Sequence, residues 1–289
     1  MSEPHSKQFL IDARESWWND DQLRAIAGRL ELVEVRTAAD VGCGQGHWTR
    51  LVAALLPATA TITGIDREPE WIAIAEARGG ARYQVGTAEQ LPFADRSLDL
   101  VTAQTVLIHV ADPPAVLREM ARVLRPGGKL WLLEPNNLVA SVSLFADPKA
   151  DPDLLGAAFR LELVAQRGKH ALGLGYNSLG EKLVGLLDPA MWQDLDVRLC
   201  DRVHFAAPPY RPGLIDDVKA SQGEPPIITW PREETLRYFL AGGGQAAQFD
   251  ALWDASVVLL RERQRAILAG EYAAAEGMLF YSTTATRCT

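Results

Sequence analysis

The chain has 289 residues, of which 48% are hydrophobic, enough for one large packed domain with insertions or for two small domains. Its 37 acidic residues outnumber 29 lysines and arginines, and the net charge of -8 disfavours nucleic acid as a partner. The three cysteines are few, odd in number and far apart, so we expect neither a disulfide framework nor a cysteine metal site.

The composition also bears on location. Residues 1–18 lack the basic start and the long apolar stretch of a signal peptide, and no later run reaches membrane-spanning length. We therefore expect a cytoplasmic protein that does not bind membranes.

In the first half of the chain, short apolar runs alternate with amphipathic segments of helical length. In the segments between the runs, apolar residues recur at intervals of three and four, and proline or glycine ends each segment, as in helices. This alternation favours a mostly parallel sheet with helices on both faces. The five strands predicted here are 37–41, 61–65, 82–85, 98–103 and 129–133.

The alternation fails after Asn137. Residues 138–176 read as helical segments broken by ADPKADPD and RGKHALGLG, too long for a plain connection and typical of a lid. A helix is predicted for SLGEKLVGLLD and a strand for DLDVRLCDRVHF, followed by a mostly helical stretch at 211–275. The threonine-rich GMLFYSTTATR predicts a closing strand, which we expect to pair with the strand before it.

These elements predict one α/β domain over residues 1–289, with a Rossmann-like sheet of seven strands, a closing antiparallel strand and helical lid insertions. Its parts are an N-terminal helical cover (1–35), a cofactor-binding core (36–137), a lid insertion (138–176) and a helical insertion before the last strand (211–275).

The first predicted strand and helix are joined by a glycine-rich turn in TAADVGCGQGHWTR. Gly42, Gly44 and Gly46 follow Asp40 at alternate positions. Glycine adopts backbone angles barred to other residues and lets a ligand approach the main chain, so we expect a ligand on this turn. A tight turn without a ligand is one alternative. A dinucleotide site is another, but its G-x-G-x-x-G spacing differs from the spacing here.

Four ordered motifs resemble the class I S-adenosylmethionine-dependent methyltransferases, in the small-molecule group related to the ubiquinone and menaquinone methyltransferases. The resemblance covers about residues 38–137 and implies S-adenosylmethionine as cofactor and S-adenosylhomocysteine as product. The four motifs are DVGCGQG, Asp66 in ITGIDREPEWIAIAEAR, GTAEQLPFADRSLDLV and LREMARVLRPGGKLWLLEP.

The resemblance also implies a set of cofactor-binding residues. Asp40 would hold the ammonium of the cofactor above the glycine turn, and Asp66 would accept hydrogen bonds from its ribose. Gln104 would offer its carbonyl to the methionine portion. The full set is Asp40, Gly42, Gly44, Gly46, Asp66, Arg67, Thr87, Ala88, Glu89 and Gln104.

The adenine side departs from the family in one position. Arg67, Ala88 and Glu89 would lie beside the adenine, but many relatives have aspartate where this chain has Thr87. A threonine oxygen accepts a hydrogen bond without carrying charge, so cofactor affinity is expected to be lower.

The cofactor's sulfonium activates its methyl group, so transfer by in-line displacement needs mainly a positioned nucleophile and exclusion of water. His109 is the candidate base for an oxygen or carbon nucleophile, with a packing or capping role as the alternative. Glu134 ends the fifth predicted strand and either faces the acceptor or is solvated.

We expect a small-molecule acceptor enclosed by the N-terminal segment and the two insertions, with the oligomeric state open and a homodimer among the alternatives. Other functions left open are a nicotinamide-dependent oxidoreductase, a non-catalytic methyltransferase-like partner subunit, and a different use of the same cofactor. The candidate pocket aromatics are Trp17, Trp18, Phe145, Phe159, Tyr176, Tyr210, Trp230, Tyr238, Phe239 and Trp253.

Overall fold

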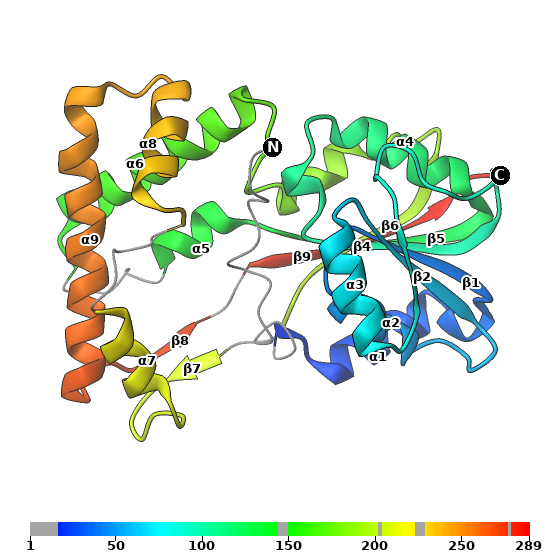
Figure 1. The fold of residues 1–289 in the computed structure, drawn as a ribbon, viewed down its shortest axis with the longest axis horizontal. Coiled ribbons are helices and arrows are strands. Elements are labelled where there is room, and N and C mark those ends of the chain that lie inside the picture. The colour runs from blue at the N-terminus through cyan, green and yellow to red at the C-terminus, as the bar shows by residue number, and fades with distance from the viewer. Residues whose placement is uncertain (1–16, 144–149, 202–203, 223–228, 277–278) are drawn as a thin grey trace.

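The structure is a computed structural model that describes residues 17–143, 150–201, 204–222, 229–276 and 279–289. Figure 1 shows two regions side by side, a sheet with flanking helices and a group of helices. We call the first region the sheet half and the second the helical lobe.

The sheet half is built on seven strands in the order β3-β2-β1-β4-β5-β9-β6. The strands β1 to β5 pair in parallel, whereas β9 runs antiparallel to both of its neighbours. The predicted seven-stranded Rossmann-like fold is therefore confirmed. The strands are β1 (Thr37–Val41), β2 (Thr61–Asp66), β3 (Arg82–Val85), β4 (Leu98–Gln104), β5 (Leu124–Pro135), β6 (Trp192–Leu199) and β9 (Phe280–Arg287).

The central strands are apolar because both of their faces are covered. In β5, Leu130 and Leu132 pack on one face in a cluster with Leu117 of α4, while Trp131 and Leu133 pack on the other face with Trp48 of α2. The elements that flank the sheet are α1 (Asp20–Arg29), η3 (Leu32–Glu34), α2 (His47–Ala53), α3 (Pro69–Arg78), η4 (Leu107–His109), α4 (Pro113–Val123) and η5 (Gly180–Leu186).

The helical lobe joins the two insertions into one body, although they are far apart in the sequence. Leu161 of α6 is buried in a cluster with Phe239, Phe249 and Trp253. Gly168 lets α6 approach α8 closely, because a Cβ there would overlap the backbone of Tyr238. The lobe contains α5 (Asn137–Ser143), α6 (Pro152–Ala171), β7 (His204–Ala206), α7 (Leu214–Ser221), α8 (Arg232–Ala241), α9 (Ala246–Ala269) and β8 (Ala274–Glu276).

The connections place this lobe at the carboxyl edge of the sheet. The strand β5 ends at Pro135 and α5 begins at Asn137, so the chain passes from the sheet directly into the helical lobe (Figure 1). Open parallel sheets bind their ligands at this edge.

The five strands of the first half are found where they were predicted, with β5 extended at both ends, and the closing strand pairs with β6 as expected. Three predictions in the second half were wrong. The segment RGKHA does not break a helix but continues α6, SLGEKLVGLLD forms the 3-10 helix η5, and DLDVRLCDRVHF divides between β6 and β7. The strand β8, which pairs with β7, was not predicted.

Within the described ranges, none of the helices is both long and apolar enough to cross a bilayer.

Candidate functional site

The glycine turn follows β1 at the carboxyl edge of the sheet. Gly42, Gly44 and Gly46 have φ angles of 70°, 52° and 76°, all in the left-handed region that favours glycine. A Cβ on Gly42 would overlap the side chain of Val106, and one on Gly46 would overlap the ring of Tyr83. The chain's own side chains therefore account for two of the three glycines, so the glycine pattern alone does not establish a ligand.

Hydrogen bonds inside the chain fix the shape of this turn. The N–H of Gly42 donates to the carbonyl of Ile65 at 2.7 Å, and the N–H of Gly44 donates to Asp66 Oδ2 at 2.8 Å. Asp66 Oδ1 also accepts from the N–H of Glu68 at 3.0 Å. A carboxylate has about four acceptor positions, so Asp66 retains acceptor capacity for a ligand.

Asp40 lies beneath the turn and is 1% exposed. Its Oδ2 accepts a hydrogen bond from the hydroxyl of Thr49 at 2.6 Å, whereas its Oδ1 is buried and has no partner among the described residues. Burial raises the pKa of Asp40 to about 7, and the nearby charge of Asp66 adds to the rise. A buried carboxylate oxygen without a partner is costly, so it marks a position that a donor such as an ammonium would fill.

Two more buried polar atoms without a hydrogen-bond partner in the described part of the chain lie at the end of the neighbouring strand β4. Gln104 is 6% exposed, and its Nε2 has no hydrogen-bond partner in the described part of the chain. Thr105 follows, with a buried Oγ1 that likewise lacks a partner there and with φ at 57°, a strained value for a β-branched residue. Strained residues gather at functional sites, but no feature of the sequence pointed to Thr105.

His109 ends η4, immediately after β4, and is half-buried. Glu134 lies beside the same turn but is 0% exposed, so the interpretation of Glu134 as a solvated side chain was wrong. Its Oε1 accepts hydrogen bonds from the N–H groups of Val106 and Leu107, at 2.9 Å and 2.8 Å. Burial raises the pKa of Glu134 to about 7 against the opposing effect of these bonds.

Thr87, Ala88 and Glu89 lie on the loop after β3, where Thr87 and Glu89 are exposed and Ala88 is half-buried. Arg67 is also exposed, at the end of β2, and its Nε lies 3.3 Å from Glu68 Oε1. The structure thus brings the predicted residues to adjacent strand ends, with Asp40 and Gln104 buried and the adenine-side residues at the surface.

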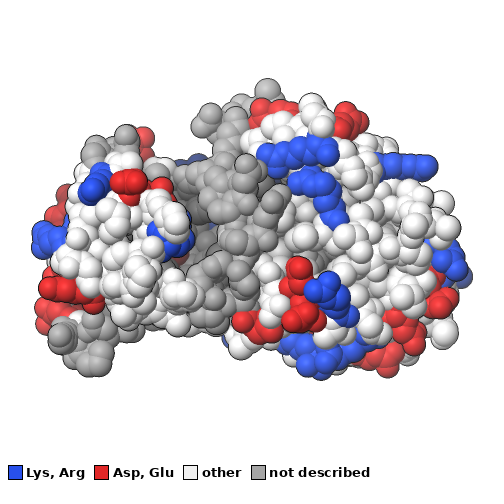
Figure 2. All heavy atoms as spheres, turned by 90° about the horizontal axis from the view of Figure 1, so that it is seen from below, with Lys and Arg blue, Asp and Glu red and all other residues white. Residues whose placement is uncertain are grey.

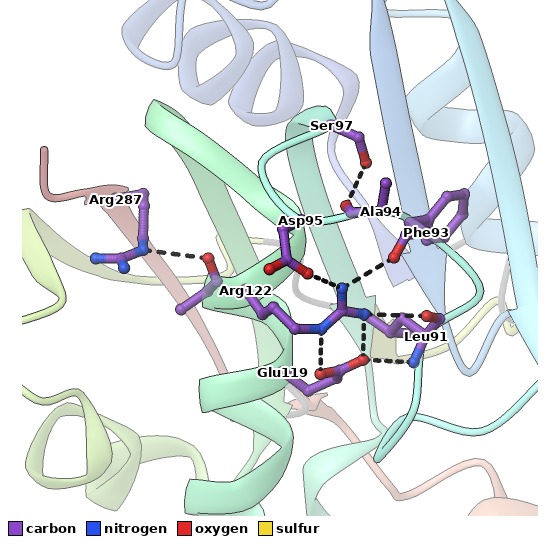
Figure 3. Close-up of polar contacts among 9 residues, drawn as sticks. Leu91, Phe93, Ala94, Asp95, Ser97, Glu119, Arg122 and Arg287 are labelled. Carbon is purple, nitrogen blue, oxygen red and sulfur yellow. Dashed lines mark hydrogen bonds and ion pairs between the residues drawn. The ribbon is translucent and has the colours of Figure 1, made fainter.

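A polar network anchors the loop that carries Thr87 (Figure 3). Arg122 of α4 donates to Glu119 at 2.7 Å and to Asp95 at 2.6 Å, and also to the carbonyls of Leu91 and Phe93. Glu119 in turn accepts from the N–H of Leu91 at 2.7 Å. Glu119 and Arg122 are three residues apart on a helix, a spacing that favours a pair, and this was the signal in the sequence that could have identified them.

Most of the candidate pocket aromatics are core residues. Trp18 packs against Trp48 and Phe280, and Trp230 packs edge-on against Tyr238. Phe239 and Trp253 belong to the core of the helical lobe. Three others are partly or largely accessible, namely Phe159, Tyr176 and Tyr210, while Trp17 is half-buried and Phe145 lies outside the described residues.

Two further histidines lie in or beside the helical lobe. His170 is exposed at the end of α6, where its ring packs edge-on against Tyr176 at 6.2 Å. His204 begins β7. His109 stays the candidate base, because η4 places it directly after the strand end that carries Gln104.

The surface carries both signs of charge. In the view of Figure 2, lysine and arginine side chains lie interspersed with acidic side chains over the sheet half. The charge visible on this face is therefore mixed rather than concentrated in one basic patch.

Comparison with known proteins gives consistent results. Residues 39–132 match the family model of the methyltransferase domain. A ubiquinone biosynthesis O-methyltransferase from Xanthomonas oryzae pv. oryzae is 35% identical over 146 residues, which cover 44% of this chain and 59% of that protein. A trans-aconitate 2-methyltransferase from Methylobacterium radiotolerans is 29% identical over 228 residues, which cover 77% of this chain and 78% of that protein.

Among solved structures, the YcgJ protein from Bacillus subtilis matches with a TM-score of 0.50 at 16% identity, over 94% of this chain and 100% of that chain. At this identity the likeness concerns the fold alone. The chain spans little more than half the length of the ubiquinone relative.

Proposed function

We propose that the protein transfers the methyl group of S-adenosylmethionine to a small-molecule acceptor. The premise is that residues 39–132 of this chain are a class I S-adenosylmethionine-dependent methyltransferase domain. The observation that carries the proposal is the pair of buried, unpartnered polar atoms at adjacent strand ends, Oδ1 of Asp40 and Nε2 of Gln104. They lie beside a turn that a hydrogen bond from Gly44 to Asp66 holds in place.

The polar atoms present fit the groups of S-adenosylmethionine. Asp40 supplies an acceptor for the ammonium. Gln104 was expected to offer its carbonyl to the methionine portion; the unpartnered Nε2 of its side chain is proposed instead to donate to the carboxylate of that portion. Asp66 would accept from the ribose hydroxyls with the capacity that Gly44 and Glu68 leave over. The N–H groups of Gly42 and Gly44 already donate within the chain, so the turn would contact the cofactor through its carbonyls and Cα atoms.

When bound, the cofactor supplies an activated methyl group that is open to displacement. The chain's own part is to hold the acceptor in line, to exclude water and, for an oxygen or carbon nucleophile, to take up a proton. His109 is proposed as that base, since η4 places it directly after the strand end that carries Gln104.

We propose that the helical lobe covers the acceptor, with the chain acting as one domain whose insertions form the lid. The trans-aconitate relative is named for a small molecule, and its similarity extends over 77% of this chain, well beyond residues 39–132. A small-molecule acceptor fits this cover better than a macromolecule, which would need an open groove.

The experiment has two parts. Calorimetry with S-adenosylhomocysteine and, separately, with NADH tests the cofactor, and we expect binding of the first and none of the second. Incubation with methyl-labelled S-adenosylmethionine and a metabolite extract, followed by mass spectrometry, then tests for a labelled product. Binding of NADH in place of S-adenosylhomocysteine would contradict the proposal, and cofactor binding without any labelled product across extracts would favour a non-catalytic role.

A further inference from the structure

Two fully buried charged side chains meet at the short turn between β4 and α4. Lys169 of α6 and Glu134 of β5 are both 0% exposed, and both make hydrogen bonds to the backbone of the segment of residues 105–109. We propose that Lys169 is a positioning residue, whose ammonium holds this turn from the side of the helical lobe. The inference rests on the proposed function, because the turn borders the proposed cofactor site.

The contacts of Lys169 are made across the boundary between the two regions. Its Nζ donates to the carbonyl of Ile108 at 2.9 Å and to Asn177 Oδ1 at 3.2 Å. Both hydrogen-bond acceptors are neutral, and the carboxylates of Glu234, Glu134 and Glu162 also favour the charge, so dipoles and carboxylates together offset the cost of burying it. A methionine or leucine would fill the same space at lower cost, and the lysine therefore indicates a requirement for a donor at Ile108.

Glu134 supplies the complementary contact at the other end of the turn. It accepts from the N–H groups of Val106 and Leu107, whereas Lys169 donates to the carbonyl of Ile108. A negative group thus binds the donors of the turn and a positive group binds its acceptor. The backbone of the turn is held by a strand on one side and by the helical lobe on the other.

A second contact joins the helical lobe to the same turn. Gly175 follows α6 with φ at 84°, and a Cβ there would overlap the carbonyl of Ile108. The segment after α6 therefore packs directly on η4. Lys169 and Gly175 together make the position of the turn depend on the position of α6.

The turn itself is strained, so it needs such support. Thr105 has φ at 57°, which is unfavourable for a β-branched residue and persists only where the surroundings impose it. Val106 packs against Gly42 of the glycine turn. A shift of this segment would therefore displace the glycine turn and His109 together.

Lys169 remains charged at neutral pH. Burial lowers its pKa to about 8, and the carboxylates of Glu134, Glu162 and Glu234 oppose this shift. Glu162 is itself hydrogen-bonded, to Gln166 and to Thr229 at 2.8 Å and 2.9 Å. With a pKa of about 8, the lysine is mostly protonated at pH 7.

The test compares Lys169→Met and Lys169→Gln with a matched control, Arg160→Met. Arg160 is a cation on the same helix, but its hydrogen bond to Gln248 stays inside the helical lobe. Hydrogen exchange is measured on the peptide that contains residues 105–109, without any ligand, and calorimetry measures the affinity for S-adenosylhomocysteine. Melting temperatures show which variants are folded.

We expect Lys169→Met to speed exchange of this peptide at least tenfold while peptides from α8 and α9 keep their wild-type rates. Lys169→Gln retains a donor and should show a smaller increase; it replaces the methionine variant if that one does not fold. Both variants should weaken S-adenosylhomocysteine binding several-fold. The control, Arg160→Met, should leave both the exchange rates and this affinity at their wild-type values.

Unchanged exchange in a folded Lys169 variant would overturn the inference, as would an equal increase in Arg160→Met or across the whole lobe. Because the exchange readout needs no cofactor, it separates this inference from the proposed function. If the wild-type protein does not bind S-adenosylhomocysteine, the proposed function fails whatever the exchange shows.

Discussion

The sheet half and the helical lobe are assembled over different sequence distances. In the sheet half, β1, β2 and β4 are each followed by a helix, and the candidate site from Asp40 to His109 lies within this continuous stretch of the chain, although β9 joins the sheet from far along the chain. In the helical lobe, the contacts join distant segments, such as Arg160 to Gln248, 88 residues apart, and Glu162 to Thr229, 67 residues apart. The comparison suggests that cofactor chemistry is encoded locally, whereas the shape of the acceptor cover is encoded by long-range packing.

This difference implies that the two regions can be perturbed separately. Variants of the strand ends should change cofactor affinity, and variants inside the helical lobe should act first on the packing of that lobe. Lys169 is the exception that we propose, since it connects the two regions at Ile108.

The largest effect is expected for Asp66→Ala. The variant removes a charged acceptor for the ribose and also the bonds from Gly44 and Glu68 that hold the glycine turn. Calorimetry should show that binding of S-adenosylhomocysteine weakens by about 2 to 4 kcal/mol, since hydrogen bonds to charged groups are the stronger kind.

The matched control is Glu76→Ala, which removes an exposed carboxylate from α3 and should leave the affinity unchanged. A wild-type affinity in a folded Asp66→Ala protein would mean that the cofactor does not use the end of β2. It would also remove the basis for treating the sheet half as the cofactor-binding region.

The next effect is expected in the helical lobe, for Gly168→Ala. The added Cβ would overlap the backbone of Tyr238 and force α6 away from α8. Overpacking of this kind typically costs about 1 to 3 kcal/mol in the free energy of unfolding, which a denaturant titration measures. Binding of S-adenosylhomocysteine should weaken by less than about tenfold, because the disturbance reaches the cofactor side indirectly, through the contacts of Lys169 and Gly175 with Ile108.

Gly156→Ala serves as the control on the same helix. Gly156 has no atom near the position of a Cβ, and alanine favours helix by about 0.5 to 1 kcal/mol over glycine, so this variant should be neutral or more stable. If both glycine variants destabilised the protein equally, the close approach of α6 and α8 would not explain the result.

Much of the sheet half could be predicted from the sequence, because its signals are local. Apolar runs of strand length, the glycine turn and the acidic end of β2 each span only a few residues, and the strand ends lie where these patterns placed them. Asp40, Asp66 and Gln104 could therefore be placed at one edge from their positions in the chain alone.

The remaining features depend on contacts between distant residues. Gly42 makes room for Val106, and Gly46 makes room for Tyr83. The motif alone does not predict these contacts. The left-handed conformation of Thr105 is imposed by its surroundings, since threonine by itself disfavours it. Lys169 reads as an ordinary surface lysine of an amphipathic helix until α6 is placed against η4.

A third prediction concerns pH. Burial raises the pKa of Asp40 to about 7, so the folded protein holds a proton there that the unfolded chain releases near pH 4. The contribution of Asp40 to the free energy of unfolding therefore falls as the pH rises from about 4 to 7. Ligand binding has the opposite trend, because only the ionised carboxylate attracts an ammonium.

The affinity for S-adenosylhomocysteine should accordingly rise with pH below 7, by at most about tenfold per pH unit, and level off above it. Calorimetry between pH 5.5 and 8, chosen as about 1.5 units below and 1 unit above that pKa, measures the effect. Asp40→Asn should flatten the profile. Glu134→Gln should keep a steep profile, since the hydrogen bonds of Glu134 go to the N–H groups of Val106 and Leu107 and the ammonium is proposed to lie at Asp40. A steep profile in Asp40→Asn would assign the proton to another group.

The smallest effect is expected for Thr87→Asp, which tests the adenine side. Thr87 is exposed, and Arg122 anchors its loop through Leu91 and Phe93, so a new carboxylate should not shift the backbone. Calorimetry should show an unchanged or a few-fold tighter affinity for S-adenosylhomocysteine, because solvent screens an exposed charge.

Thr87→Asn separates charge from shape in this experiment, since asparagine has the size of aspartate without its charge. If aspartate tightens binding and asparagine does not, the added charge acts on the adenine amino group. A loss of more than about tenfold with aspartate, or about 1.4 kcal/mol, would mean that the side chain at this position is enclosed when the ligand is bound. The adenine would then be covered, and the exposed loop after β3 would have to close over it.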